Sequence, residues 1–300
     1  MISRKGIAIW EALVVFIVAP SAMVSVGSLA MLGPLKRAQE MTNRAVCMSN
    51  LSSINKALVL YRASNEDVWP WLGDLTSDPS AVTTGTNRNR RPPENRGKPD
   101  KRSVTSLMFL LVRDYQTPAV FRCPSDRNAM VDDAPKAGED DGDVKEGEYY
   151  WDFSSPRNVS FSWQAPIHNG AKKPKAVRYL QGIDGAELDS VVVADMTPAA
   201  VDPNWKPADL SKIQDPIARS ENSLNHYREQ INVLYVAGNV KGVKRPDVGT
   251  RLNRSNIVIR RDNIYTASND AKAGSQSATS LDIKKHLSGK DTFLIGPVGR

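Results

Sequence analysis

Residues 4–32 read RKGIAIWEALVVFIVAPSAMVSVGSLAML and contain the strongest pattern in the chain. The run at 7–32 is apolar except for Glu11, its only ionisable side chain. As a helix this run is about 39 Å long, which is enough to cross a bilayer with some tilt. A carboxylate inside it costs about 2.5 to 3.5 kcal/mol of insertion free energy, so an acid there is expected to have a partner. We therefore expect one membrane-spanning helix that carries a functional acid.

The residues that flank Glu11 resemble the class III signal of type IV pilins and type II secretion pseudopilins. Five positions carry the resemblance: Arg4, Lys5, Gly6, Ile7 and Glu11. In that family a prepilin peptidase cuts after the glycine and methylates the new first residue. The resemblance implies a leader peptide at 1–6, a cut between Gly6 and Ile7, and a transmembrane or filament-core helix at 7–33. This chain departs from the family at Ile7, where the usual residue is Phe.

The same resemblance implies that Glu11 acts in assembly. In the family this acid accepts the α-ammonium group of a neighbouring subunit as the filament forms. An acid and an amine that are buried together lose less solvation free energy than either would lose alone. The implied partners are copies of this chain, other pilin-like subunits, the prepilin peptidase, the assembly platform of the inner membrane and that membrane itself. No nucleic acid is expected.

Two other interpretations of the N-terminus compete with this one. Arg4 and Lys5, with small residues at 28–30, would suit a cleaved secretory signal peptide, but such peptides have apolar regions of only about 7 to 15 residues. A plain single-pass anchor would leave Glu11 without a role. The basic N-terminus is expected to stay in the cytoplasm. We therefore expect a single-pass inner-membrane protein whose globular domain is periplasmic.

The rest of the chain predicts an α+β fold with long loops. Because the long helix precedes the strands, we expect its second half to pack on a small antiparallel sheet, as in pilins. Gly33 and Pro34 are expected to break the helix where it leaves the membrane. The globular part, 34–300, is expected to hold an amphipathic helix at 34–64, a loop-rich insert at 65–150, a β-sheet region at 151–266 and a polar tail at 267–300.

Local patterns predict the shorter elements. A helix is expected at 103–115, with Ser103 as a candidate N-cap. A hairpin is indicated by strand candidates at 231–236 and 240–244, joined by a turn that contains Gly238. Further strands are expected at 158–163, 177–180 and 190–194.

Two charged runs stand out in a chain of net charge +7. Residues 88–102 are mainly basic, residues 132–148 are mainly acidic, and neither run has apolar periodicity. We therefore expect two solvated loops, which are able to attract one another within or between subunits.

Five short motifs in the body resemble elements of pseudopilin-like proteins that are abundant in planctomycetes. Their residues, in chain order, are 44–51 with Ala57, Leu58 and Tyr61, then 121–126, 191–195, 223–226 with 232–235 and 238–240, and 261–266. Each motif is modest, and their shared order is the stronger signal. The chain departs from these relatives at Ala237 and Asn239, where they have Asp and His. Any ligand that depends on that pair is not expected here.

The chain has two cysteines, Cys47 and Cys123. In an oxidising compartment they are able to form one disulfide, which would tie the end of the long helix to the globular body. Closing so long a loop adds a few kcal/mol of stability, by a model-dependent estimate of roughly 3 to 5 kcal/mol. The alternative is two buried free thiols.

The sequence gives little sign of catalysis. No phosphate-binding loop or nucleophile motif is present. Asn225 and His226, if they lie close to Asp195, form either an acid–base pair or a histidine that hydrogen-bonds across the strands, and we favour the second. The acids at 140–143 do not have the spacing of a calcium loop. The three histidines lack metal-ligand spacing and are His168, His226 and His286.

The sequence thus predicts a structural protein, with no enzymatic activity, metal or cofactor expected. It would be a subunit of a type II secretion pseudopilus or of a type IV pilus-like filament. The alternative is a membrane-tethered binding module that captures an anionic ligand through its basic loop at 88–102.

Overall fold

The computed structural model describes about half of the chain. Along α1 it gives the backbone from Arg4 and the side chains from Gly33; at 251–252, 260–261 and 295 it gives the backbone alone. The described residues are 4–64, 88–91, 111, 114–130, 136–164, 190–202, 205, 213–249, 251–252, 260–261, 263–265 and 294–295.

The chain divides into two compact units, Met1–Asn43 and Arg44–Arg300. The first consists, in its described residues, of the N-terminal part of helix α1 (Arg4–Ser64). The predicted break at Gly33 and Pro34 is wrong, because α1 is assigned as one helix through both residues. A proline removes one backbone hydrogen bond, but the turns on either side keep theirs, and Gly33 has no side chain to crowd the ring.

Among the described residues, no helix is both long enough and apolar enough to span a membrane. The side chains of the expected anchor at 7–33, including Glu11, lie outside the described residues.

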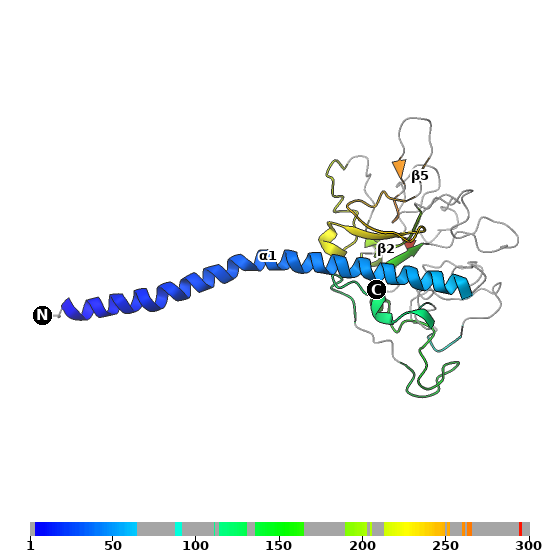
Figure 1. Cartoon of the computed structure of the whole chain (residues 1–300), viewed down its shortest axis with the longest axis horizontal. Coiled ribbons are helices and arrows are strands. Elements are labelled where there is room, and N and C mark those ends of the chain that lie inside the picture. The colour runs from blue at the N-terminus through cyan, green and yellow to red at the C-terminus, as the bar shows by residue number, and fades with distance from the viewer. Residues whose placement is uncertain are drawn as a thin grey trace. The chain divides into compact units, whose positions relative to one another are not determined.

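The second unit is built on an antiparallel sheet of five strands in the order β4-β3-β2-β1-β7. Figure 1 labels β2, one strand of this sheet. Together with α1 it makes the fold α+β, as predicted. A separate pair joins β5 (Arg251–Leu252) to β6 (Arg260–Arg261). The strands of the main sheet are β1 (Phe161–Gln164), β2 (Val191–Asp195), β3 (Ile231–Tyr235), β4 (Val240–Val243) and β7 (Leu294–Ile295).

The central strands β2 and β3 are buried along their whole length, so both faces of the sheet are covered. Side chains of β3 alternate between two apolar clusters, as the period of two in a strand requires. Leu234 belongs to the cluster that contains the α1 side chains, whereas Val233 and Tyr235 belong to the cluster on the other face. The α1 side chains of the first cluster are Cys47, Leu51, Ile54, Ala57 and Leu58.

The predicted hairpin is confirmed. The Gly238 N–H donates to the Tyr235 carbonyl at 2.8 Å, and the Tyr235 N–H donates to the Asn239 carbonyl at 3.0 Å. Gly238 has φ +83°, and a Cβ there would lie 2.8 Å from the Asn55 side chain on α1. Glycine is therefore favoured at this turn for its backbone conformation, whereas the end of the Asn55 side chain is able to move away from a Cβ.

Of the other short predicted elements, two strands have different bounds in the structure, and the rest lie wholly or mostly outside the described residues. The strand expected at 158–163 begins only at Phe161, because Pro156–Asn158 forms a 3₁₀ turn (η2) that Ser155 caps. The strand expected at 190–194 is β2, shifted by one residue. The strand expected at 177–180 lies outside the described residues, as does most of the helix expected at 103–115.

The start of the basic run packs on the acidic run within the chain. The Arg88 guanidinium lies 4.2 Å from the centre of the Tyr150 ring, and the Arg91 N–H donates to the Asp143 carboxylate at 3.0 Å. The Asp143 N–H in turn donates to the Asn89 carbonyl at 2.9 Å. The described residues of the two runs, 88–91 and 136–148, are mostly exposed, yet specific contacts hold them in place.

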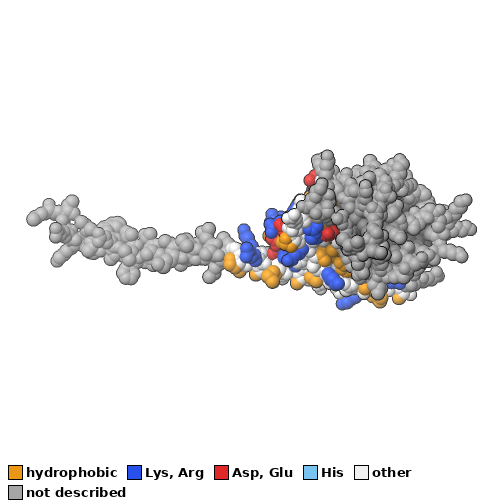
Figure 2. Space-filling view, turned by 90° about the horizontal axis from the view of Figure 1, so that it is seen from above, with side chains coloured by type: hydrophobic (Ala, Val, Ile, Leu, Met, Phe, Trp, Pro, Cys, Tyr) orange, Lys and Arg blue, Asp and Glu red, His pale blue; other side chains and the backbone are white. Residues whose placement is uncertain are grey.

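The described part of α1 carries exposed apolar side chains among Lys and Arg side chains (Figure 2). In the second unit, Val59 and Leu60 are about half exposed, whereas Leu51 is fully buried. One helix therefore offers two leucines in opposite environments.

Leu51→Ala should lower the free energy of unfolding by about 2 to 5 kcal/mol, because it leaves a cavity between α1 and the sheet. Leu60→Ala, at a leucine that is 51% exposed, should change it by less than about 0.5 kcal/mol. Urea unfolding of the full chain followed by tryptophan fluorescence measures both. Equal losses in the two variants would contradict the assigned packing of α1 on the sheet.

Candidate functional site

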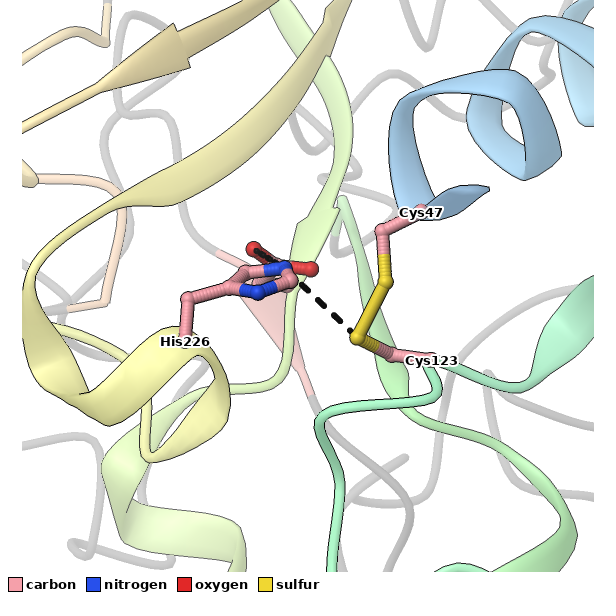
Figure 3. Close-up of side chains that lie close together, drawn as sticks. Cys47, Cys123 and His226 are labelled. Atoms are coloured by element: carbon pink, nitrogen blue, oxygen red, sulfur yellow. Dashed lines mark hydrogen bonds and ion pairs between the residues drawn. A yellow bond between two sulfur atoms is a disulfide. The ribbon is translucent and has the colours of Figure 1, made fainter. Parts of the chain in front are cut away.

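A disulfide joins Cys47 on α1 to Cys123, which follows the short helix η1 (Pro118–Phe121) (Figure 3). The two Cα atoms are 5.3 Å apart, the cysteines are 76 positions apart in sequence, and both are fully buried. Of the two alternatives that the sequence left open, the structure has the bridge. A second link lies beside it, because the Asn50 amide donates to the Arg122 carbonyl at 2.9 Å.

The imidazole of His226 lies against this disulfide (Figure 3). Its Nε2 atom is 3.5 Å from Cys123 Sγ and 2.8 Å from the Asn232 amide nitrogen. The Asn232 amide oxygen accepts a hydrogen bond from Gln230, which orients the amide so that its nitrogen faces His226. Nε2 is then the acceptor, so the ring is the neutral tautomer that carries its proton on Nδ1.

Asp195 completes the site from the end of β2. Its Oδ2 atom accepts the Asn232 N–H at 2.6 Å and lies 3.5 Å from His226 Nε2. Its Oδ1 atom makes no hydrogen bond, although the side chain is fully buried. Burial in this apolar setting raises the pKa of Asp195 to about 6, against the opposing effects of His226 and of the Asn232 N–H.

Further polar groups surround this core of the site. The Tyr265 hydroxyl donates to the Asp195 carbonyl at 2.7 Å, and burial raises the pKa of that phenol. The Asn225 amide donates to the Ser160 carbonyl at 3.2 Å, and the Ser160 hydroxyl donates to Asp126 at 2.6 Å. The segment that carries Cys123 is thus bonded to β1 and to the turn that carries His226.

His226 is presented by a strained turn, η5 (Asn225–Arg228). Three consecutive residues other than glycine have left-handed backbone angles: His226 at φ 55°, Tyr227 at 54° and Arg228 at 60°. Each such residue costs roughly 1 to 2 kcal/mol. Arg44 of α1 helps to hold the turn, because it donates to Glu229 at 2.9 Å and to the His226 carbonyl at 3.4 Å.

The structure places the predicted site residues in two groups. His226 and Asp195 come together, and His226 hydrogen-bonds across to β3, the interpretation that we favoured from the sequence. The processing and assembly residues Gly6, Ile7 and Glu11 lie where side chains are not described, and His168 and His286 also fall outside the described residues.

The acids at 140–143 do not gather around a common point. Asp140 is bonded to Lys145 Nζ at 2.8 Å and to the Glu146 N–H, and these hydrogen bonds lower the pKa of Asp140. Asp141 accepts from the Asn89 amide at 3.0 Å. Within the described part of the chain, only one group of side chains has the proximity of metal ligands, namely Cys47, Cys123, Asp195 and His226.

The chemistry that this site supports in the disulfide form is structural. The side chains of Asp195 and His226 are both fully buried, so a substrate does not reach them in this conformation. The site fastens α1, the segment after η1, β2 and β3 to one another.

The sequence does not predict the roles of three residues. Asn232 lies in the predicted hairpin and Tyr265 in the motif at 261–266, yet both contact Asp195. Asn50, in the motif at 44–51, donates to the Arg122 carbonyl. Their membership of these motifs is the only sequence feature that marks them.

No protein-family model, no curated protein and no solved structure matches the chain.

Tyr227 tests the strain in the left-handed turn, because its side chain is 53% exposed and is stacked by Arg127. Tyr227→Ala and Tyr227→Gly both remove the ring, but only glycine adopts φ 54° without steric cost. We expect the glycine variant to be more stable than the alanine variant by about 1 kcal/mol. Urea unfolding compares them, and a more stable alanine variant would contradict the left-handed assignment.

The buried carboxyl of Asp195 predicts a pH-dependent stability. The folded chain keeps a proton on Asp195 up to about pH 6, whereas the usual pKa is 3.8. The stabilisation of the folded state by this bound proton is therefore complete below pH 3.8 and is lost as the pH rises through 6. The stability of the wild type minus that of Asp195→Asn should fall by on the order of 2 to 3 kcal/mol between these limits.

Both proteins are unfolded in urea at several pH values from 4 upwards. The disulfide is kept intact and a metal chelator is present throughout. Taking the difference between them cancels the titration of all other carboxylates. A difference that stays constant or grows with pH would show that Asp195 is not held in a desolvated site.

Proposed function

We propose that this chain is a structural, pilin-like subunit that assembles into a type II secretion pseudopilus or a type IV pilus-like filament. Its partners would be copies of itself, other pilin-like subunits, the prepilin peptidase and the assembly platform of the inner membrane. The anchor at 7–33 would hold it in that membrane, with a cytoplasmic N-terminus and a periplasmic globular domain.

The observation that carries the proposal is Glu11 in an otherwise apolar run, five residues after Gly6. A lone helix in lipid gains nothing from such an acid, whereas a bundle of subunits gains a charge partner for each N-terminus. Cleavage after Gly6 would create the α-ammonium group that this partnership needs. The pattern thus explains the acid, the glycine and the length of the run together.

The architecture of the second unit supports the proposal. A filament subunit needs a globular domain that is firmly joined to the helix that enters the bundle. Here α1 contributes a full row of core side chains and a disulfide to that domain. Its described outer face keeps exposed apolar side chains, among them Val46, Val59 and Leu60.

The contacts of the described part of the basic run, 88–91, do not favour the alternative, a binding module that captures an anionic ligand. Arg88 and Arg91 stack on Tyr150 and Trp151. The backbone next to them is bonded to the acidic run. A surface for polyanions would instead hold its cations free of nearby carboxylates.

Glu11→Ala tests the proposal in the membrane of a host that carries a prepilin peptidase. We expect the wild-type chain to begin at methylated Ile7 by intact mass and to form multimers captured by crosslinking. The variant should keep a folded globular domain but lose most of this multimerisation, because its neighbour's ammonium group has no acceptor.

The matched control is Glu139→Ala, which removes one exposed glutamate from the globular domain. It should assemble like the wild type. Equal assembly of Glu11→Ala and wild type, or a purified chain that starts at Met31 or keeps its first six residues, would refute the proposal.

A further inference from the structure

The four side chains around the disulfide have the composition of a zinc site. Two cysteines, one histidine and one aspartate each offer one ligand atom, and these atoms all lie within 4.8 Å of one another. Thiolate sulfur, imidazole nitrogen and carboxylate oxygen are the usual protein ligands of Zn²⁺. The ligands come from α1, the segment after η1, β2 and η5, so the fold itself gathers them.

The distances fit a tetrahedron around one ion. With usual zinc bond lengths, the nitrogen and sulfur ligands of a tetrahedral site are about 3.6 Å apart, and the nitrogen and oxygen ligands about 3.3 Å. In the structure, His226 Nε2 is 3.5 Å from Cys123 Sγ and 3.5 Å from Asp195 Oδ2. Two edges of the tetrahedron are therefore nearly in place. The two sulfurs, once unbonded, need to separate to about 3.8 Å.

The state of the ligands also suits a metal. His226 is the tautomer whose Nε2 has its lone pair toward the cluster, where it now accepts the Asn232 amide. Asp195 holds a fully buried carboxylate with one oxygen that has no hydrogen-bond partner. A buried carboxylate whose oxygens are only partly paired costs free energy, and a cation bound at its other oxygen, Oδ2, would offset that cost.

We propose that the reduced chain binds one Zn²⁺ through Cys47, Cys123, Asp195 and His226, and that the disulfide and the metal are alternative ways of closing the same site. The same two sulfurs serve both forms, so the two exclude each other. The site would then report the thiol redox state of its surroundings. This inference does not depend on the proposed assembly function.

The exchange balances in electrons, protons and charge. A dithiol reductant gives two electrons and two protons to the disulfide, which becomes two thiols while the reductant becomes a disulfide. Zn²⁺ then displaces both thiol protons to solvent. With Asp195 ionised and His226 neutral, the buried group carries one negative charge in the disulfide form and also in the zinc form. The exchange therefore adds no net charge to the interior.

Cobalt(II) is the probe, because tetrahedral cobalt bound to thiolates has intense visible bands and a sulfur-to-metal charge-transfer band. The full chain is unfolded and reduced in urea with a dithiol, freed of the reductant without oxygen, and refolded with or without one equivalent of Co²⁺. We expect one Co²⁺ per chain with thiolate bands, displacement by one equivalent of Zn²⁺, and slower reformation of the disulfide in air. The oxidised chain should show none of these bands.

Variants separate this site from adventitious binding. Cys123→Ser should lose the charge-transfer band, and Asp195→Asn should bind at least tenfold more weakly. The control Asp202→Asn, at a carboxylate outside the cluster, should bind like the wild type. Circular dichroism reports whether each chain has refolded.

Three outcomes would overturn the proposal. The first is a reduced chain that gives no thiolate bands. The second is Cys123→Ser binding Co²⁺ as the wild type does. The third is a reduced chain that stays unfolded with metal under conditions in which the oxidised chain refolds, because binding at a native site must stabilise the fold.

Discussion

The bond between Cys47 and Cys123 is the constraint on which the globular unit depends. It joins the helix to a segment 76 positions later, and the loop so closed contains residues that belong to neither helix nor sheet. Such a crosslink acts chiefly by removing conformations from the unfolded chain, with an effect of a few kcal/mol at this loop length, roughly 3 to 5 kcal/mol. A loop-rich domain gains most from it, because its short strands offer few backbone pairs.

The strained turn at His226 lies against that disulfide, with the imidazole Nε2 3.5 Å from Cys123 Sγ. Left-handed backbone angles at three successive residues carry a cost that ordinary loops avoid. The hydrogen bond to Asn232 and the Arg44 contact with the His226 carbonyl offset that cost. The burial of Asp195 is offset in the same way by its neighbours.

Sequence patterns predicted the fold where local rules decide. The hairpin around Gly238, the burial of β2 and the helical row through Leu51 follow from periodicity and turn chemistry. The break at Pro34 was wrong, because neighbouring turns carried the helix past it. The partners of Asn232 and Tyr265 were out of reach, since their contacts span tens of residues. The left-handed turn was also out of reach, because no glycine marks it.

Short motifs that lie far apart in the sequence contribute side chains to the same buried site. Each of these motifs contributes one side chain to a single buried cluster. In chain order these side chains are Cys47, Cys123, Asp195, His226 and Tyr265. The side chains of that cluster are buried, and their contacts hold the helix, the strands and the turn of the domain together. The filament chemistry that we propose rests instead on Glu11, in the other unit. The part of α1 that is bonded into the globular unit and the part that carries Glu11 therefore have separate roles, and a substitution in one part need not affect the role of the other.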